Sequence, residues 1–178
     1  QINNKENNLK IFTYVGSIKH NSRIPNLFLD WLELVEFDFK CNFYGDSSLL
    51  KSYLIKNHPN LINSFSFNKN ISYENVPNIL KSSDINLVFE EKKPSSESQF
   101  GTIPTKIFEY IAVGVPVISE MSEKVMAHSI LKESGLLIHN FSYKVSKNDI
   151  YFEKKEVNDQ LKLSLSRKNG ANKLLKAI

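Results

Sequence analysis

One helix-forming segment carries two residues, Lys106 and Glu109, whose types and spacing could bind a ligand. Pro104 suits the first turn of a helix, because the N–H groups of that turn have no partner within the helix. Such a helix start attracts anions, and Lys106 adds a positive charge there. Glu109, about one turn further on, can accept hydrogen bonds from two neighbouring hydroxyls. The pattern suits a ligand with phosphate and diol groups, although an amphipathic helix with a Lys–Glu surface pair fits the same residues equally well.

The same segment predicts how this helix packs. We expect one apolar stripe against a sheet, formed by Ile107, Phe108, Ile111 and Ala112. Tyr110 has the spacing to share a second face with Lys106 and Glu109. Gly114 is expected to end the helix, and Pro116 to prevent its continuation.

The elements that must position this helix alternate between strands and helices. Strands are expected at 10–15, 39–44, 62–67, 85–89, 115–119 and 136–139. Helices are expected from Pro25, from 47–48 to 58, and at 72–80, 104–113, 124–133 and 161–178. Alternation with short connections predicts an α/β fold, a doubly wound, Rossmann-like parallel sheet with helices on both faces. We expect residues 1–9 to be frayed and 10–178 to form one domain.

In such sheets, ligands bind at the carboxyl ends of the strands. The informative loops are therefore at Gly16, Gly45, 68–73, 90–105 and Ser119. The polar segment 90–99 is expected to be a mobile surface loop.

Composition narrows the class of protein. The chain has 178 residues, of which 41% are hydrophobic and 24% charged, so one domain with a packed core is expected. Its single cysteine, Cys41, excludes a disulfide framework and a cysteine-based zinc site, and the four scattered histidines predict no metal site. No apolar run reaches the roughly 18 residues of a membrane span. No secretory leader opens the chain, and we expect the natural N-terminus to lie upstream of Gln1.

The charge balance is basic, with a net charge of +4, and 21 of the 23 basic residues are lysine. Arginine is favoured for reading bases and for bidentate phosphate contacts, so the lysine excess argues against a nucleic-acid partner. The sequence also lacks the glycine patterns of P-loop and dinucleotide-binding proteins. An anionic membrane surface or a phosphate ligand remains compatible with the charge, and composition alone does not choose between them.

Several other polar residues have ordinary structural interpretations. Asp46 and Asp84 suit turns, His20 suits a solvated loop, and the adjacent Lys92 and Lys93 suit a solvated surface. The single tryptophan, Trp31, is expected in the core or at a domain contact.

The run PTKIFEYIAVGVPVIS resembles the donor-binding signature of GT-B-type glycosyltransferases of the large retaining "group 1" family. Three further segments resemble that family in the right order: FTYVGSIKHNSRIPNLFLDWLELV, FKCNFYGD and ISYENVPNILKSSDINLVF. The resemblance covers residues 10–137. It implies the C-terminal, donor-binding domain of a two-domain enzyme whose N-terminal acceptor domain is absent from this chain.

The resemblance also implies roles for individual residues. Donor nucleotide contacts would come from Gly16, Ser17, Ile71, Tyr73, Thr105, Lys106 and Glu109. Within this set, Glu109 would bind the ribose, Thr105 and Lys106 the diphosphate, and Ile71 and Tyr73 the base. Arg23 and Lys106 would be the catalytic cations that stabilise the leaving diphosphate.

Two positions depart from the family pattern. Gly101 stands where the family has an acidic residue near the donor sugar, and with Thr102 it would line the sugar site. Ser17 stands where the family often has arginine. Both departures put sugar contacts and catalysis in doubt more than nucleotide binding.

The expected reaction moves a sugar from a nucleoside-diphosphate sugar to an acceptor hydroxyl, with retention and without a cofactor or an obligatory metal. The expected partners are a nucleotide sugar and, through the missing domain, a glycan or lipid-linked acceptor. The resemblance implies bacterial polysaccharide synthesis in the cytoplasm, with association of the full protein with the membrane surface. The alternatives are a catalytically degenerate module that binds a nucleotide or a partner protein, and half of a nucleotide-sugar epimerase.

Overall fold

A computed structural model of the chain describes residues 9–94, 100–101, 103–142 and 150. Its centre is a six-stranded sheet in which every neighbouring pair is parallel, in the order β3-β2-β1-β4-β5-β6. The strands are β1 (Lys10–Val15), β2 (Phe39–Tyr44), β3 (Phe65–Asn68), β4 (Ile85–Phe89), β5 (Val117–Glu120) and β6 (Leu137–Asn140). The predicted doubly wound α/β fold is confirmed.

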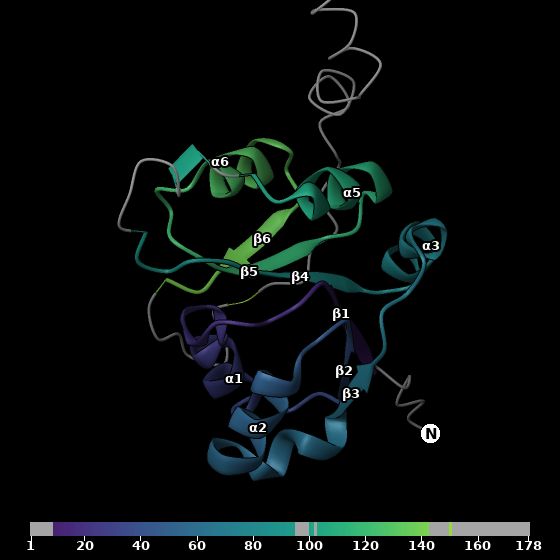
Figure 1. Ribbon diagram of the computed structural model, residues 1–178, viewed down its shortest axis with the longest axis vertical. Helices are drawn as coiled ribbons and strands as arrows, with labels where there is room; N and C mark the ends of the chain where they lie inside the picture. The colour runs from purple at the N-terminus through teal and green to yellow at the C-terminus, as the bar shows by residue number, and fades with distance from the viewer. Residues whose placement is uncertain (1–8, 95–99, 102, 143–149, 151–178) are drawn as a thin grey trace, which may run out of the picture.

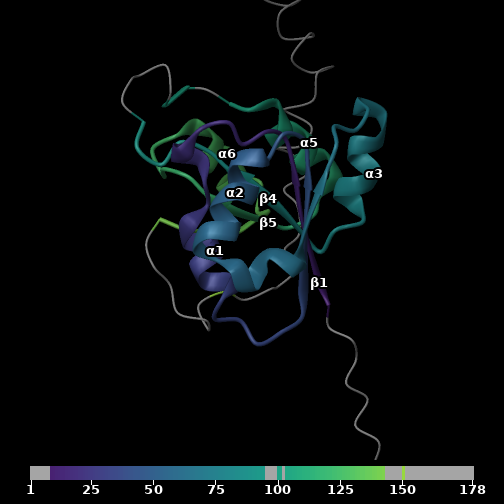
Figure 2. The ribbon, with the colours of Figure 1, turned by 60° about the horizontal axis from the view of Figure 1, so that its bottom comes forward.

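Helices cover both faces of this sheet (Figure 1). On one face lie α1 (Asn26–Leu32) and α2 (Ser48–Asn57), and on the other α3 (Val76–Lys81), α5 (Thr105–Val113) and α6 (Met126–Glu133). Figure 2 shows α3 standing apart from α1 and α2, across the strands. Short 3₁₀ turns occupy Asn21–Arg23, Pro59–Ser64 and Tyr73–Asn75.

The two faces bury different kinds of side chain. Under α1 and α2 the core is largely aromatic, with Phe12, Tyr14, Phe28, Trp31 and Phe43 all less than 2% exposed. Under α3, α5 and α6 the core is mainly aliphatic. The strand alternation of side chains explains this separation. In β4, Leu87 and Phe89 join the aromatic side and Val88 the aliphatic side.

Most elements predicted from the sequence lie within a few residues of those observed, but the segment between α2 and β3 differs. Residues 62–64, expected to be strand, belong to the 3₁₀ turn that begins at Pro59, and β3 starts only at Phe65. Proline suits a helical first turn, and Leu61 is the turn's buried residue, which holds it against the core. The expected helix at 161–178 and the expected fraying of residues 1–8 lie outside the described residues.

The order of strands reverses between β1 and β4. These two strands are paired at Phe12↔Ile85 and Thr13↔Asn86, whereas β1 stays paired with β2 as far as Val15↔Tyr44. A ligand crevice forms at such a switch point, beyond the carboxyl ends of the strands. The fold therefore directs attention to the residues that follow β1 and β4.

Candidate functional site

Three charged side chains from distant parts of the sequence meet beyond the ends of β1 and β4. The Arg23 Nη2 atom lies 3.0 Å from Oε2 of Glu90, and the Lys106 Nζ atom lies 3.0 Å from Oε1 of the same carboxylate. Arg23 ends the 3₁₀ turn after β1, Glu90 directly follows β4, and Lys106 lies in the first turn of α5. Glu90 is thus the residue that brings the two predicted catalytic cations together.

Lys106 is seated against an aromatic ring. Its Nζ atom donates a hydrogen bond to the Tyr14 hydroxyl at 3.1 Å and lies 4.7 Å from the centre of the Tyr14 ring. Burial by itself would lower the pKa of Lys106, but the Tyr14 hydroxyl and the Glu90 carboxylate outweigh it, so the pKa lies above its ordinary value. Lys106 therefore remains a cation at neutral pH.

The glycine loop after β1 lies against the same tyrosine. The Tyr14 hydroxyl donates to the Ser17 carbonyl oxygen at 3.5 Å, and a Cβ atom at Gly16 would lie 3.4 Å from the Tyr14 oxygen. Gly45 supports this loop from β2, since a Cβ atom there would lie 2.3 Å from the Gly16 carbonyl oxygen. Four predicted residues, Gly16, Ser17, Arg23 and Lys106, therefore gather around Tyr14 and Glu90.

The α5 helix presents a different face from the one expected. Phe108 is 37% exposed and Ala112 is also exposed, so they are not part of the buried stripe. Instead Tyr110 is fully buried, and its hydroxyl donates to the Leu87 carbonyl oxygen at 2.9 Å. Of the expected apolar stripe, Ile107 and Ile111 are buried, but Phe108 and Ala112 are not. Tyr110, expected on a second face with Lys106 and Glu109, belongs to the buried face instead.

The physical reason lies in the phase of the helix. Residues at i, i+3 and i+4 share a face, and the face that meets β4 carries Ile107, Tyr110 and Ile111. Burial raises the pKa of the Tyr110 hydroxyl, which stays neutral. Glu109 is half-buried, and Thr105 is exposed near the start of α5, whose N-cap residue, Pro104, makes no side-chain cap hydrogen bond.

The remaining predicted residues are more dispersed. Ile71 is half-buried against the aliphatic core, and Tyr73 is 64% exposed at the start of its 3₁₀ turn. A Cβ atom on Gly101 would meet no atom within 4 Å among the described residues, and Thr102 lies outside them. The structure thus gives no contact that joins Gly101 to the Arg23–Lys106 group.

Sequence reasoning missed Glu90. It was expected in a mobile surface loop, but it is only 7% exposed, and its backbone N–H donates to the Glu120 carbonyl oxygen at 3.2 Å. The expectation of a surface position is wrong because Glu90 continues β4 at its carboxyl end and is hydrogen-bonded there to the neighbouring strand. The available signal was its position directly after the continuous apolar run of β4, at the ligand-binding end of a central strand.

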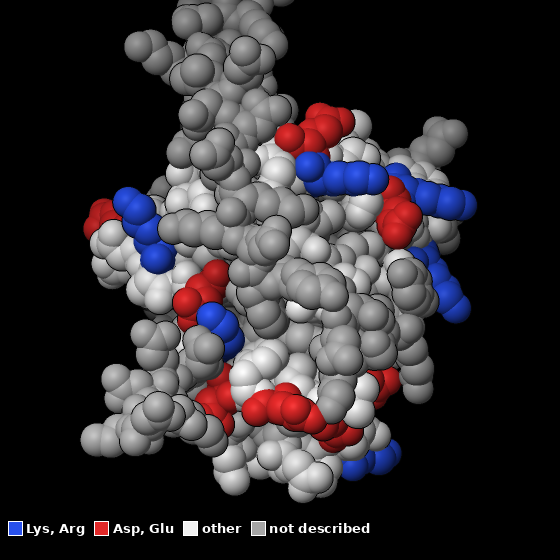
Figure 3. All heavy atoms as spheres, turned by 180° about the vertical axis from the view of Figure 1, so that it is seen from behind, with Lys and Arg blue, Asp and Glu red and all other residues white. Residues whose placement is uncertain are grey.

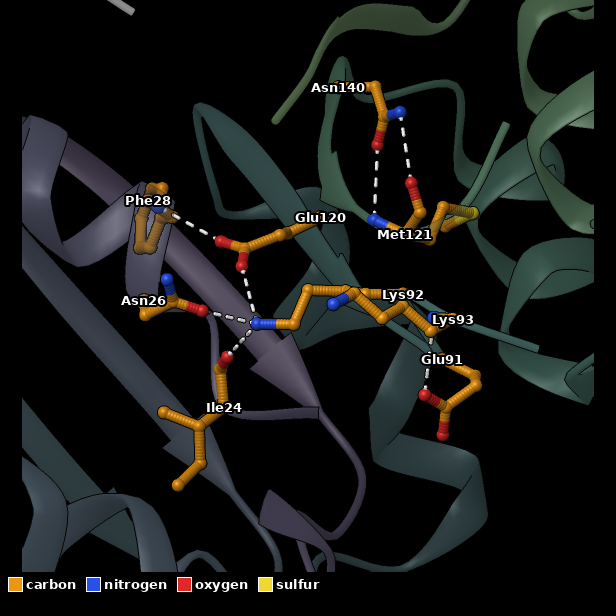
Figure 4. Close-up of polar contacts among 9 residues, drawn as sticks. All are labelled: Ile24, Asn26, Phe28, Glu91, Lys92, Lys93, Glu120, Met121 and Asn140. Atoms are coloured by element: carbon orange, nitrogen blue, oxygen red, sulfur yellow. Dashed lines mark hydrogen bonds and ion pairs between the residues drawn. The ribbon is translucent and has the colours of Figure 1, made fainter. Parts of the chain in front are cut away.

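A second ion pair, between Lys92 and Glu120, is drawn in Figure 4. The Lys92 Nζ atom lies 2.9 Å from Oε1 of Glu120 and donates to the Ile24 carbonyl oxygen at 2.8 Å and to the Asn26 side-chain oxygen. The other Glu120 oxygen accepts the Phe28 N–H at 2.9 Å. The expectation that Lys92 lies on a solvated surface is therefore wrong, whereas Lys93 is exposed as expected.

This second pair fixes the start of α1. Burial raises the pKa of Glu120, and the Phe28 N–H and the Lys92 ammonium oppose that rise without cancelling it. The carboxylate lies at the positive end of the α1 helix, where backbone N–H groups lack helical partners. Ile24 and Asn26 lie one and three residues after Arg23. The Lys92 contacts therefore anchor the chain next to the residue that pairs with Glu90.

Other polar features have structural roles or stand apart from this cluster. Asp46 accepts hydrogen bonds from the Ser48 N–H and hydroxyl, which confirms its turn role, and these bonds lower the pKa of Asp46. An open hollow of about 690 Å³ lies beside Asp46 and Lys69 at the ends of β2 and β3, and neither cation of the cluster lines it. Lys and Arg are interspersed with Asp and Glu over the face in Figure 3.

Among the described residues, no three His, Cys, Asp or Glu side chains are grouped as metal ligands would be. No helix in the described part of the chain has the length and apolar character needed to cross a membrane.

Comparison with known proteins supports the assignment of the fold. The family model described as "Glycosyl transferase-like" matches residues 23–159, which is more than half of the chain. No curated protein gives a significant sequence match.

Solved structures of low sequence identity share the fold. The lipopolysaccharide outer core galactosyltransferase WaaB, in its apo form, aligns with a TM-score of 0.64 and 16% identity over 98% of this chain. HepE (Alr3699) of Anabaena, in complex with UDP-glucose, aligns with a TM-score of 0.55 and 12% identity over 80% of this chain. The matches span only 51% of the WaaB chain and 37% of the HepE chain.

Proposed function

The chain belongs to the glycosyl transferase-like family and has the Rossmann-like GT-B fold, and we propose that it binds the sugar donor of a GT-B glycosyltransferase. The proposed donor is a nucleoside-diphosphate sugar. The observation that carries this proposal is the meeting of Arg23 and Lys106 at the point where the strand order reverses.

The proposed chemistry is electrostatic. When the bond between sugar and diphosphate breaks, negative charge builds up on the departing phosphate oxygens. Fixed cations placed at those oxygens stabilise the transition state more than the substrate. Arg23 can offer paired N–H donors to a phosphate, and Lys106 a buried point charge. The start of α5 adds the positive end of a helix dipole.

The rest of the donor is assigned by the resemblance and by position. We assign the ribose hydroxyls to Glu109, about one helical turn beyond Lys106, and the base to the surroundings of Ile71 and Tyr73. The sugar would lie towards Gly101 and Thr102. Gly16 and Ser17 would let the backbone approach the phosphates.

The acceptor side is proposed to lie elsewhere in a longer protein. This chain spans about half of the WaaB chain and less of the HepE chain, and transfer would need the remainder. We expect this chain alone to bind a nucleotide and to transfer no sugar. Transfer with retention, without an obligatory metal, is the proposed activity of the longer protein.

Calorimetric titration tests the donor site. HepE was solved with UDP-glucose, so UDP is the first ligand to titrate, followed by GDP and ADP. Replacing Glu109 by alanine removes the proposed ribose contact and should lower affinity by about tenfold, or about 1.4 kcal/mol. The control is Glu133→Ala, which removes an exposed carboxylate at the end of α6.

The outcomes separate the proposals. Binding by the wild-type chain that Glu109→Ala weakens and Glu133→Ala does not would support the donor site. Absence of binding to all three nucleotides would contradict it. Gly101, which stands where the family has an acidic residue, and Ser17 favour a second candidate, a nucleotide-binding module that does not catalyse transfer. Product analysis of the longer protein would distinguish this module from a transferase or an epimerase.

A further inference from the structure

The buried carboxylate of Glu90 holds two cations from different elements, and the proposed function gives it no role. We infer that Glu90 is the positioning residue of the diphosphate site, an inference that rests on the proposed function. It holds the Arg23 guanidinium and the Lys106 ammonium at one point and leaves each of them N–H groups for a phosphate.

Glu90 is itself held in place. It follows β4 directly, and its backbone N–H is bonded to the Glu120 carbonyl oxygen at the end of the neighbouring strand. Two residues later, the Lys92 side chain ties the same segment to Ile24 and Asn26 (Figure 4). The carboxylate therefore projects from backbone that is bonded on both sides of it.

Arg23 needs such a partner more than Lys106 does. The Asn21–Arg23 turn buries none of its three residues, and the Arg23 side chain is 37% exposed. A long side chain on a surface turn loses rotamer entropy when it binds a ligand. The ion pair with Glu90 selects the binding conformation beforehand, so less entropy is lost when a phosphate arrives.

For Lys106, Glu90 supplies charge balance. The Lys106 side chain is 13% exposed and its ammonium lies over the Tyr14 ring, and a charge in such surroundings requires a close counter-charge. Glu90 provides that charge while the donor site is empty. The ammonium can then stay in the site without a ligand.

Both cations keep donors beyond those that Glu90 uses. A guanidinium carries several N–H groups, and Arg23 uses one nitrogen for Glu90. An ammonium carries three, and Lys106 directs one to Glu90 and one to Tyr14. A diphosphate can bind the remaining donors without displacing the carboxylate. If Glu90 instead competed with the diphosphate for the cations, its removal would strengthen binding.

The sign of the effect can be measured with two variants and two ligands. Calorimetry would compare UDP with UMP on the wild-type chain, Glu90→Ala and Glu90→Gln. We expect Glu90→Ala to bind UDP about tenfold more weakly, or about 1.4 kcal/mol, and UMP with a smaller loss, because the second phosphate depends on both cations. The amide oxygen of Glu90→Gln can still accept one hydrogen bond. This variant should therefore bind UDP with an affinity between those of the wild-type chain and Glu90→Ala. Glu91→Gln is the matched control, since the Glu91 carboxylate accepts only a backbone N–H from Lys93 among the described residues.

The ratio of UDP to UMP affinity separates positioning from general damage. A folding defect would weaken the binding of UDP and of UMP equally, and that result would overturn the inference. Unchanged or tighter UDP binding by Glu90→Gln would also overturn it. If Glu90→Ala fails to fold by circular dichroism, Glu90→Gln decides alone. A further outcome is that Glu109→Ala binds UDP more weakly than the wild-type chain, while both Glu90 variants bind it normally. In that case the role of Glu90 fails and the donor site stands. If the wild-type chain binds neither UDP, GDP nor ADP, both proposals fail.

Discussion

Gly45 is a single residue on which the shape of the donor loop depends. Its φ angle of +119° lies in a region that residues with a side chain rarely adopt. A side chain at this position would also collide with the Gly16 carbonyl oxygen on the loop after β1. The loop carrying Ser17 and leading to Arg23 can thus approach β2 closely only because residue 45 is glycine.

Replacing Gly45 by alanine should therefore destabilise the protein. Backbone strain and the collision together should lower the free energy of unfolding by at least about 2 kcal/mol. Urea denaturation followed by circular dichroism would measure the change. Gly101→Ala is the control, since a Cβ atom there meets no described atom within 4 Å. Equal stability of the two variants would contradict this account of the loop.

The candidate site was predictable at some residues and not at others. Lys106 could be named because a cation at a helix start suits a phosphate, and Arg23 because the family resemblance implies it. The structure places the two together. Glu90 could not be named in that way, since a glutamate in a polar loop ordinarily faces water. Its burial depends on two cations, one 67 residues earlier and one 16 later, and only the folded chain brings them to it.

At the scale of elements, three of the strands were the most predictable. The bounds of β1, β2 and β4 match those expected from the sequence residue for residue. The faces of helices were less predictable, as α5 shows. Phe108 and Tyr110 are both aromatic, and the phase of the helix on the sheet decided which of them is buried. That phase is set by packing against β4, which the local sequence does not encode.

The attachment of α1 is a prediction at this scale. Lys92 ties the segment after β4 to Ile24, Asn26 and Glu120, so Lys92→Ala should leave the Glu120 carboxylate buried without its counter-charge. We expect the free energy of unfolding to fall by about 2 kcal/mol, allowing for the partial exposure of the lysine.

The neighbouring lysine provides the control for this change. Lys93 is exposed, and Lys93→Ala should change stability by less than about 0.5 kcal/mol. Urea denaturation of both variants in parallel would measure the difference. Similar values for Lys92→Ala and Lys93→Ala would show that the contacts in Figure 4 contribute little to stability.

For the molecule as a whole, the question is whether the two cores unfold together. The aromatic core contains Trp31, the only tryptophan, and the aliphatic core on the opposite face contains Leu131 of α6. Both cores pack on the same sheet, with successive residues of β4 facing opposite sides. A shared sheet should make unfolding a single transition.

Leu131→Ala should therefore be sensed by Trp31 across the sheet. Loss of this fully buried side chain should lower the free energy of unfolding by about 2–4 kcal/mol. Trp31 fluorescence and circular dichroism should shift to the same lower midpoint in urea. Met126→Ala, at an exposed position of the same helix, should shift neither. A fluorescence midpoint that stays unchanged in Leu131→Ala would mean that the two faces unfold separately.

The short pairing between β1 and β4 has a consequence for motion. Their ladder joins the half of the sheet formed by β1, β2 and β3 to the half formed by β4, β5 and β6, and the Arg23–Glu90 ion pair crosses the same boundary. Local opening along this boundary would expose amide hydrogens to exchange without unfolding either half. A ligand held by Arg23 on one side and by Lys106 on the other would resist that opening. Hydrogen exchange should then slow first at Asp84, whose backbone N–H donates to the Ile11 carbonyl oxygen across this boundary, and leave the outer strands β3 and β6 nearly unchanged.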